Sequence, residues 1–392
     1  MFFPENYEFI CPVKTNAGKR ALEHLPVELQ VFNARRPLII TGKEMVYKRL
    51  AKKVFKAFND SGIALGIFDG VDESADLAVV KEIVRIFRSG EHDSLLALGG
   101  DTVGDVSKLV NIALSYSVEN LEKVAVDNGI TQPLGPFVLL PTLAGNGYEV
   151  SKFAFLDGLT FSSPFLMPDL VIIDPRLLAT DDVTTVIETA LIALVHAVEA
   201  YVGPAKNPVV DTYAFAAIQF VMEHLVDVIK KPRTSDGRLA LANAVSMAGC
   251  AFSNSRIGIV HLLGEKVSEM FDLPHGVSMA QLLPYCLESV IERDSYHIGD
   301  LLLPLAGFDE YAATADNLRA YRAVNILYDL QHTLTRVSKG DVPLTLEAAG
   351  VPKYMLTDIA EWADSEGIEG LAYNDCVTIV THAWEGRAIM RA

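Results

Sequence analysis

Three residues between positions 255 and 280 have the types and spacing of metal ligands. His261 and Glu265 are four residues apart, so on a helix they share one face and can reach the same point in space. His275 follows Pro274, where the chain is expected to reverse. Such a set can bind a divalent metal if another ligand comes from elsewhere in the chain. A histidine that only forms a hydrogen bond is the commoner case, so the spacing alone leaves both interpretations open.

Two glycine-containing loops that follow apolar runs could bind an anion. In residues 95–114 an apolar run ends in Gly99 and Gly100, and an amphipathic helix is expected to follow. Backbone amides at such a helix start can bind a diphosphate, which makes this a candidate nucleotide site. Residues 139–152 repeat the arrangement with Thr142 and further small residues. Glycine after a strand is also ordinary turn chemistry, but two such loops favour a ligand site.

The elements that must position these residues change in character near residue 178. From residue 37 to residue 175, short apolar runs alternate with amphipathic helical segments, which is typical of a parallel sheet covered by helices. From Val183 onward nearly all of the sequence has helical periodicity. We therefore predict an α/β Rossmann-like N-terminal domain over residues 1–178 and an all-α C-terminal domain over residues 179–392. The site is expected in the cleft between them.

Composition excludes several classes of function. The chain has 392 residues, half of them hydrophobic, and can bury a large core. A net charge of -17 argues against a nucleic-acid partner, because no basic field is available to neutralise phosphates. The four cysteines are scattered without a CxxC pair, as in reduced cytosolic proteins. Apolar stretches of membrane length are interrupted by charged or polar residues, so we expect a cytoplasmic protein without a membrane partner.

Five motifs resemble, in the same order, those of the iron-containing (group III) alcohol dehydrogenases. GGDTVGDVSK at 99–108 is similar to the family's GGGSxxDxAK, and PTLAGNGYEVS at 141–151 is similar to PTTAGTGSEVT. MPDLVIIDPRLL at 167–178 resembles LPDLAIVDPEL. The segment 196–218 resembles HAIEAY followed by NPxxDxxAxxAI, and 258–284 resembles GLVHALAHPLGxxxxxPHGxxxAxLLP. The resemblance implies the dehydroquinate synthase-like fold of that family, an α/β domain followed by a helical one.

The resemblance also assigns residues to a bound dinucleotide, NADP or NAD. The residues that it places at the diphosphate are Gly99, Gly100, Asp101 and Thr102, with Asp105 nearby. Thr142 and Leu143 would face the nicotinamide.

The adenosine end of the cofactor bears on the choice between NADP and NAD. Gly42 falls where NAD-preferring relatives carry an aspartate that binds the ribose and repels a 2′-phosphate. Glycine removes that repulsion, and Lys43 could add an attraction. The sequence therefore favours NADP.

The family's metal, iron or zinc, is held by one aspartate and three histidines. His196, His261 and His275 occupy the histidine positions, but Ile192 stands at the aspartate position and cannot coordinate. Glu265 stands where the family has a further histidine. Glu265 could restore a set of three nitrogens and one carboxylate, so we expect His196, His261, His275 and Glu265 as ligands. The alternative is a site that no longer binds metal.

The resemblance implies a nicotinamide-dependent oxidoreductase that interconverts a small alcohol and its aldehyde. A metal would polarise the carbonyl as a Lewis acid while hydride passes between the carbonyl carbon and nicotinamide C4. Glu265 would be either a metal ligand or a proton relay. Glu199, in the HAVEAY motif, could support His196 or lie on a solvated helix face. We expect a homodimer.

Two other functions stay open. The VGD sequence and Lys152, six residues after Asn146, are similar to features of dehydroquinate synthase and related sugar-phosphate cyclases, lyases that use NAD transiently. Lys152 therefore joins Glu265 as a candidate catalytic residue. Such an enzyme needs several cationic side chains to bind a substrate phosphate, and besides Lys152 the sequence offers mainly Arg256 and Lys266 near the histidines, which are too few. The second alternative is a non-catalytic nucleotide-binding relative, because two of the family's chemical positions are replaced.

Overall fold

Two compact units make up the chain in the computed structural model. One unit is Ile10–Ala179, and the other combines Met1–Phe9 with Thr180–Ala392. The structure describes residues 4–116, 121–126, 129–142, 147–178, 182–231, 234–256, 258–366 and 372–389. The start of the chain joins the helical unit, whereas the sequence pattern assigned it to the sheet. Stacking explains the difference, because the Phe9 and Tyr213 rings lie 5.5 Å apart between centroids.

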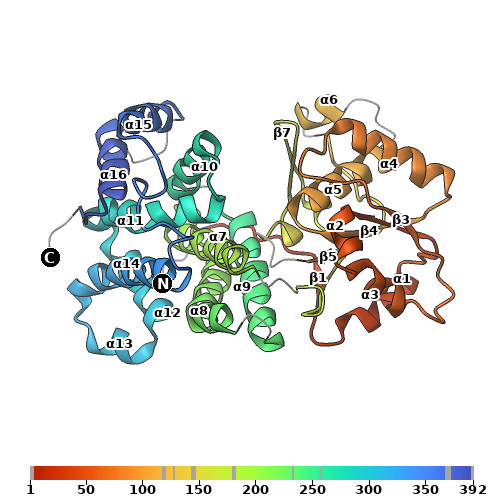
Figure 1. Ribbon diagram of the computed structural model, residues 1–392, viewed down its shortest axis with the longest axis horizontal. Coiled ribbons are helices and arrows are strands. Elements are labelled where there is room, and N and C mark those ends of the chain that lie inside the picture. Colours follow the sequence, from red (N-terminus) through yellow and green to blue (C-terminus); the bar gives the residue numbers. More distant parts are fainter. Residues whose placement is uncertain are drawn as a thin grey trace. The chain divides into compact units, whose positions relative to one another are not determined.

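A six-stranded sheet forms the centre of the N-terminal unit, with strand order β1-β8-β5-β4-β2-β3 (Figure 1). All of its strand pairs are parallel. The strands are β1 (Lys14–Ala17), β2 (Pro37–Thr41), β3 (Gly66–Phe68), β4 (Ser94–Gly99), β5 (Phe137–Pro141) and β8 (Leu170–Ile173). β2, β4, β5 and β8 are buried along their whole length, which is why they are unbroken apolar runs in the sequence.

Helices and one hairpin complete the N-terminal unit. The hairpin pairs β6 (Phe153–Leu156) with β7 (Leu159–Ser162) in antiparallel register. The helices are η1 (Ala21–His24), α1 (Leu25–Val31), α2 (Lys43–Tyr47), α3 (Leu50–Ala57), α4 (Leu77–Ser89), α5 (Asp101–Ser115), α6 (Leu121–Val126), η2 (Tyr148–Val150) and η3 (Pro164–Leu166). α5 is buried almost throughout, so its first turn is held firmly beside the sheet.

A buried carboxylate fastens η1 to the end of β8. Asp174 accepts hydrogen bonds from the Leu22 amide at 3.2 Å and from the Arg176 guanidinium at 2.6 Å. Arg176 also binds Glu23 at 2.6 Å. Burial by itself would raise the pKa of Asp174, but the hydrogen bonds from Arg176 and Leu22 outweigh it and lower that pKa below its ordinary value.

In the other unit, the regular elements formed by the described residues are all helices. Its helices are α7 (Val183–Val202), α8 (Pro208–Lys230), α9 (Ser235–Ser253), α10 (Ile259–Phe271), α11 (His275–Asp300), α12 (Leu302–Ala306), α13 (Phe308–Ala313), η4 (Asp316–Leu318), α14 (Arg319–Val337), η5 (Lys353–Met355), α15 (Leu356–Ser365) and α16 (Tyr373–Glu385). α11 contains Pro284 and a non-helical residue at Asp294, where it kinks. The predicted combination of an α/β unit and an all-α unit is confirmed.

Two helices of this unit are long and apolar enough to cross a membrane by length and composition. α7 and α8 have mean hydropathies of 1.6 and 1.3 over their most apolar windows. In α7, 72% of that window is buried inside the protein. α7 also carries the buried polar residues His196 and Glu199, so it is a core helix whose apolar surface packs against its neighbours.

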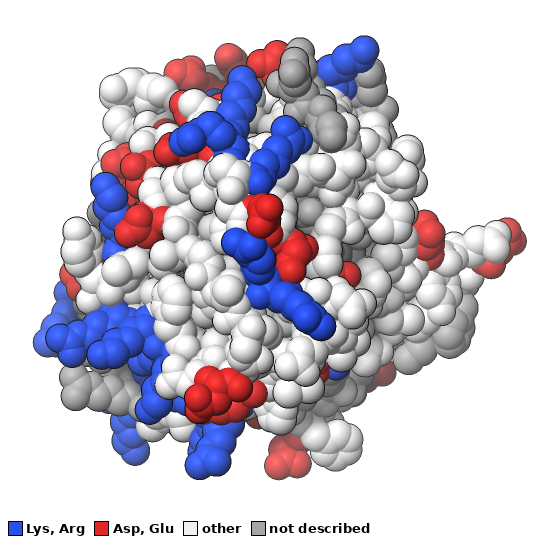
Figure 2. Space-filling model, turned by 90° about the vertical axis from the view of Figure 1, so that its right-hand side faces the viewer, with Lys and Arg blue, Asp and Glu red and all other residues white. Residues whose placement is uncertain are grey.

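The net charge of the chain is unevenly distributed. Figure 2 shows one face of the molecule, on which Lys and Arg side chains gather most densely at the lower left and Asp and Glu side chains also lie among the basic ones elsewhere. Within the N-terminal unit, α3 carries Lys52, Lys53 and Lys56. A locally basic surface is therefore compatible with the overall charge of -17.

Candidate functional site

The first loop expected to bind a dinucleotide joins β4 to α5. Gly99 ends the strand, and Gly100 is the N-cap of the helix. A Cβ on Gly99 would lie 2.6 Å from a methyl group of Val103, so only glycine allows the strand to turn into the helix this tightly. A Cβ on Gly100 would meet no atom within 4 Å. The space beside the helix start is therefore open.

The N-cap of α5, Gly100, makes no side-chain hydrogen bond to the start of the helix. The amides of the first turn of an α-helix have no partner within the helix itself. The partial positive charge of a helix N-terminus favours an anion at this position. Asp101 is exposed and Thr102 is half-buried. The loop fits the diphosphate of a dinucleotide on these grounds.

Two buried oxygens near this loop have no hydrogen-bond partner among the described residues, Thr142 Oγ1 and Asp105 Oδ1. The Thr142 amide donates to the Gly99 carbonyl at 3.2 Å, which fixes Thr142 beside the loop. Buried polar atoms are nearly always paired, so both oxygens are suited to polar groups of a ligand or to water. Leu143, expected at the nicotinamide together with Thr142, lies outside the described residues.

A buried lysine fixes the segment that follows this second loop. Lys108, on α5, is only 1% exposed and donates to the carbonyls of Tyr148 at 2.9 Å, Ser151 at 3.1 Å and Phe153 at 2.6 Å. Burial lowers the pKa of Lys108, and the charge of Asp105 opposes that shift. The sequence interpretation did not single out this lysine, although it ends the GGDTVGDVSK motif.

The expected adenosine site lies after β2. Gly42 is the N-cap of α2, and Lys43 is exposed. A Cβ on Gly42 would lie 2.7 Å from the Val71 carbonyl oxygen, because Gly42 forms an isolated bridge with Gly70. The close approach of the two backbones thus explains the glycine independently of cofactor choice.

In the helical unit, three imidazoles lie together. His196 is on α7, His261 is on α10 and His275 begins α11. We call these residues the histidine cluster. His196 Nε2 lies 3.2 Å from His261 Nδ1, and the rings of His261 and His275 are 5.3 Å apart between centroids. Phe252 stacks on His196 at 4.1 Å. Residues 79 positions apart in the chain thus meet in one small region.

Burial sets the charge state of this cluster. His261 is 5% exposed, and burial together with the nearby His275 lowers the pKa of His261 to about 3. Burial also lowers the pKa of His275. Both imidazoles are therefore neutral near pH 7, the form in which histidine binds a metal or donates one hydrogen bond.

Models of one protein family match both parts of this chain. The model for iron-containing alcohol dehydrogenase matches residues 12–175. The model for the C-terminal part of the Fe-containing alcohol dehydrogenase family matches residues 186–373. The chain belongs to the iron-containing alcohol dehydrogenase family. The motifs that resemble this family lie within the matched residues, except that the motif at 167–178 extends three residues beyond the first match.

Named relatives of this iron-containing alcohol dehydrogenase family are similar along most of their length. The 1,3-propanediol dehydrogenase of Klebsiella pneumoniae is 28% identical over 71% of this chain and 74% of its own. The NAD-dependent methanol dehydrogenase of Bacillus methanolicus is 27% identical over 75% of this chain and 79% of its own. The crystal structure of a 1,3-propanediol oxidoreductase has a TM-score of 0.86 at 24% identity, covering 97% of this chain and all of that one. This similarity confirms the fold.

Membership of this family implies a metal, and the histidine cluster contains the three histidines that the sequence motifs assign to it. Ile192 occupies the position of the aspartate ligand, and its side chain lies beside Gly276, next to His275. Glu265 Oε2 is 3.8 Å from His261 Nε2, but the Glu265 side chain is 63% exposed. No group of three His, Cys, Asp or Glu side chains among the described residues could hold a metal ion. The donors do not fit the family's metal as they stand, since an apolar side chain replaces the anionic ligand and His196 and His261 face each other in a hydrogen bond.

Glu199 positions the helix that carries His261. Glu199 is buried. The alternative that the sequence left open, a place on a solvated helix face, is therefore wrong. The Glu199 carboxylate accepts from the Val260 amide at 2.7 Å and the His261 amide at 3.2 Å, and so caps the start of α10. A Cβ on Gly258, the N-cap of α10, would lie 2.2 Å from Glu199 Oε1. Burial raises the pKa of Glu199 to about 7, against the effect of these amides.

The cations that a sugar-phosphate cyclase would need have other contacts. Lys266 binds Glu269 at 3.2 Å and lies 5.3 Å from the centre of the Trp362 ring. The ammonium of Lys152 lies 5.5 Å from the ring centre of its neighbour Phe153. Arg256 is exposed. These contacts give no support to a phosphate site built from these cations.

Proposed function

We propose that this member of the iron-containing alcohol dehydrogenase family is an NAD(P)-dependent oxidoreductase that interconverts a small alcohol and its aldehyde. The observation that carries the proposal is the start of α5, where the N-cap Gly100 has no side chain and leaves open space for an anionic diphosphate at the positive end of the helix dipole. The unpartnered oxygen of Thr142 adds a polar contact next to that loop. Relatives named for 1,3-propanediol, methanol and butanol support the substrate class.

A bound nicotinamide would supply or accept the hydride, and the chain's residues would handle oxygen and proton. A neutral imidazole of the histidine cluster can donate a hydrogen bond to the substrate oxygen as negative charge develops on it. Partial burial and the neighbouring Glu269 raise the pKa of Glu265, and Glu265 lies within 3.8 Å of His261. We assign Glu265 the role of proton relay, because a carboxyl group with a raised pKa exchanges protons more readily near neutral pH. Lys152 has no part in this mechanism.

The α5 loop offers a direct test of cofactor binding. Gly100 has φ of -92° and an open Cβ position, so it accepts other residues without backbone strain. Gly100→Asp should weaken NAD(P)H binding at least about tenfold, because its carboxylate would face the diphosphate. Fluorescence titration of NADH and NADPH measures the affinity, and Gly100→Ala is the matched control for added bulk.

Turnover separates the proposal from its alternatives. Oxidation of NADPH or NADH with short-chain aldehydes such as propanal or butanal, followed at 340 nm, should be cofactor-dependent and slowed in Gly100→Asp. Cofactor binding without turnover of any aldehyde or alcohol would instead identify a non-catalytic relative. Turnover of a sugar phosphate without net change in cofactor would identify a lyase.

We further propose that NADP is the preferred cofactor. The support is the absence of an acidic side chain at Gly42 and the charge of the exposed Lys43. Lys43→Glu should raise the dissociation constant of NADPH about tenfold while that of NADH changes little. Lys52→Glu, an exposed lysine on α3, is the control for net charge. Tighter binding of NADH than of NADPH by the wild type would refute the preference.

The proposal includes a cytoplasmic homodimer. The four cysteines of the chain form no disulfide with one another, which supports a reducing compartment. The dimer rests on the family resemblance. Sedimentation velocity of the purified protein distinguishes a dimer from a monomer or a larger assembly.

A further inference from the structure

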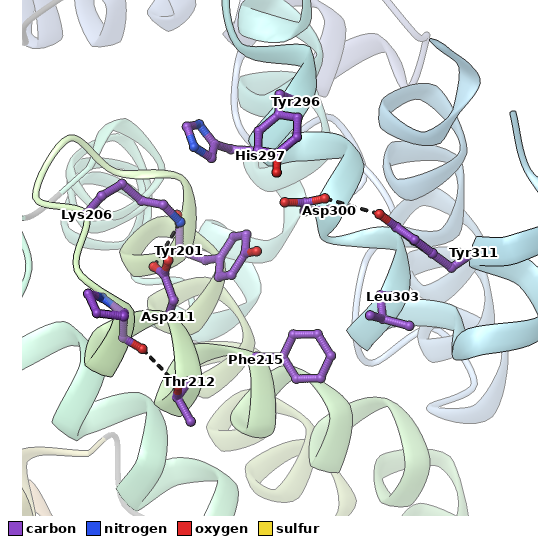
Figure 3. Close-up of a pocket in the computed structure, with 11 residues that line it drawn as sticks. Tyr201, Lys206, Asp211, Thr212, Phe215, Tyr296, His297, Asp300, Leu303 and Tyr311 are labelled. Atoms are coloured by element: carbon purple, nitrogen blue, oxygen red, sulfur yellow. Dashed lines mark hydrogen bonds and ion pairs between the residues drawn. The ribbon is translucent and has the colours of Figure 1, made fainter. Parts of the chain in front are cut away.

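A pocket of about 390 Å³ opens in the helical unit, away from the histidine cluster. Its walls come from the end of α7, the start of α8, the end of α11, and from α12 and α13 (Figure 3). His275 begins α11, whereas Tyr296 and Asp300 of the pocket lie in its last turns. At 1.5 Å per residue, roughly 30 Å of kinked helix separates the two positions. The volume is that of a small-molecule site.

Aromatic rings form much of the wall of this pocket. Figure 3 shows the rings of Tyr201 and Phe215 and the side chain of Leu303 around a common space. The face of an aromatic ring attracts cations. Two of the rings already do so within the chain: the Lys206 ammonium lies 3.8 Å from the centre of Tyr201, and Arg319 lies 3.8 Å from the centre of Tyr311.

One carboxylate in the pocket, that of Asp300, forms no ion pair with a cation among the described residues. Lys206 Nζ binds Asp211 at 2.8 Å, so those two charges offset each other. Asp300 accepts a hydrogen bond from the Tyr311 hydroxyl at 3.3 Å, and no Lys, Arg or His in the described part of the chain forms an ion pair with it. Asp300 lies between Tyr296 and Tyr311 in Figure 3. The pocket thus combines aromatic faces with one uncompensated negative charge.

The local chemistry narrows the ligand to one class. An anion would be repelled by Asp300. A hard metal ion needs several oxygen ligands, and Asp300 is the carboxylate of the pocket that no cation neutralises. An alkylated ammonium ion, in contrast, gains from one carboxylate and several ring faces without requiring a coordination shell. Phe215 and Leu303 give it an apolar wall.

We propose that this pocket binds an alkylated ammonium ion, with its charged head between Asp300 and the tyrosine rings and its apolar part against Phe215 and Leu303. The site is independent of the proposed dehydrogenase activity, because none of the residues of the histidine cluster or of the α5 loop lines it. It gives the helical unit a second ligand site.

Calorimetric titration of the full-length protein with benzyltrimethylammonium chloride tests the proposal. We expect saturable binding of about one ion per chain, and no binding of benzylsulfonate, an anion of similar size. Asp300→Asn should weaken binding at least about tenfold, since it removes the charge and keeps the shape. Asp309→Asn removes an exposed carboxylate that does not line the pocket and should leave the affinity unchanged.

A second variant keeps the test decisive if Asp300→Asn does not fold. Tyr296 is 60% exposed, so Tyr296→Ala should fold normally and weaken binding by about two- to fivefold through loss of one ring. The proposal is wrong if the wild type shows no saturable binding up to about 10 mM, the range of very weak ligands. It is equally wrong if both pocket variants bind the ion as the wild type does. If the wild type does not bind the ammonium ion and Asp300→Asn changes the oligomeric mass, the proposal is also wrong, and the pocket belongs to an interface between copies of the chain.

Discussion

Replacing Lys108 with methionine should loosen the segment that follows the second glycine-containing loop and destabilise the N-terminal unit. Methionine keeps most of the length of the side chain and removes the ammonium. The ammonium makes hydrogen bonds of 2.9, 3.1 and 2.6 Å to the carbonyls of Tyr148, Ser151 and Phe153. A hydrogen bond to a charged group contributes about 1.5–3 kcal/mol, and the three share one donor group and do not add in full. We expect a loss of about 3–5 kcal/mol in the free energy of unfolding of this unit.

Urea unfolding followed by circular dichroism measures that loss, with Lys52→Met as a control at an exposed lysine. Hydrogen exchange of peptides covering residues 147–156 should rise in Lys108→Met and stay unchanged in the control, because the loop loses its internal anchor. The affinity of Lys108→Met for NAD(P)H should also fall below that of the wild type. Coincident unfolding curves and unchanged exchange would refute the reasoning, since they would mean that the buried lysine holds nothing in place.

Three further outcomes follow from the structure. Ile192→Asp should bind zinc about 10–100-fold more tightly than the wild type, because it places a carboxylate beside the histidine cluster. Competition with a chelator measures the two affinities, and equal affinities would contradict the prediction. Gly258→Ala should displace the Glu199 carboxylate and lower the free energy of unfolding by about 1–3 kcal/mol. It should also shift the NMR signals of the His261 imidazole. Unchanged signals would mean that the Glu199 cap on α10 does not position the His261 ring. Asp174→Asn should lower the free energy of unfolding by about 2 kcal/mol at pH 7. Because folding lowers the pKa of Asp174, this difference from the wild type should shrink as the pH falls below about 4. A difference that stays constant with pH would contradict this reasoning.

The buried strands and their parallel arrangement were predictable because of their burial. β4 and β5 lie in the middle of the sheet and are covered on both faces, so their sequences are apolar at successive positions and end in loops of small residues. Gly99 stood out for the same reason, since a tight turn from a buried strand into a buried helix leaves no room for a side chain there. Local patterns of this kind are visible in a single sequence.

Contacts between distant segments were not predictable in the same way. Lys108 looks like an ordinary charged residue of a helix, and its acceptors lie 40 to 45 positions further along the chain. Glu199 likewise finds its partner amides 61 and 62 positions away. The spacing of His261 and Glu265 correctly indicated one helix face, but it could not tell that the Glu265 carboxylate stays largely in solvent. Long-range packing decides these cases.

The cap that α7 supplies to α10 also constrains the order in which the molecule folds. A helix start with unsatisfied amides is costly to bury, and α10 has no capping side chain of its own. The first turn of α10, and with it His261, therefore becomes stable only once α7 has formed and brought Glu199 into place. His196 lies one turn before Glu199 on α7, so the event that orders one imidazole also orders the other. The histidine cluster should accordingly appear in a single late step of folding, and its imidazoles should lose their protection together when that contact opens.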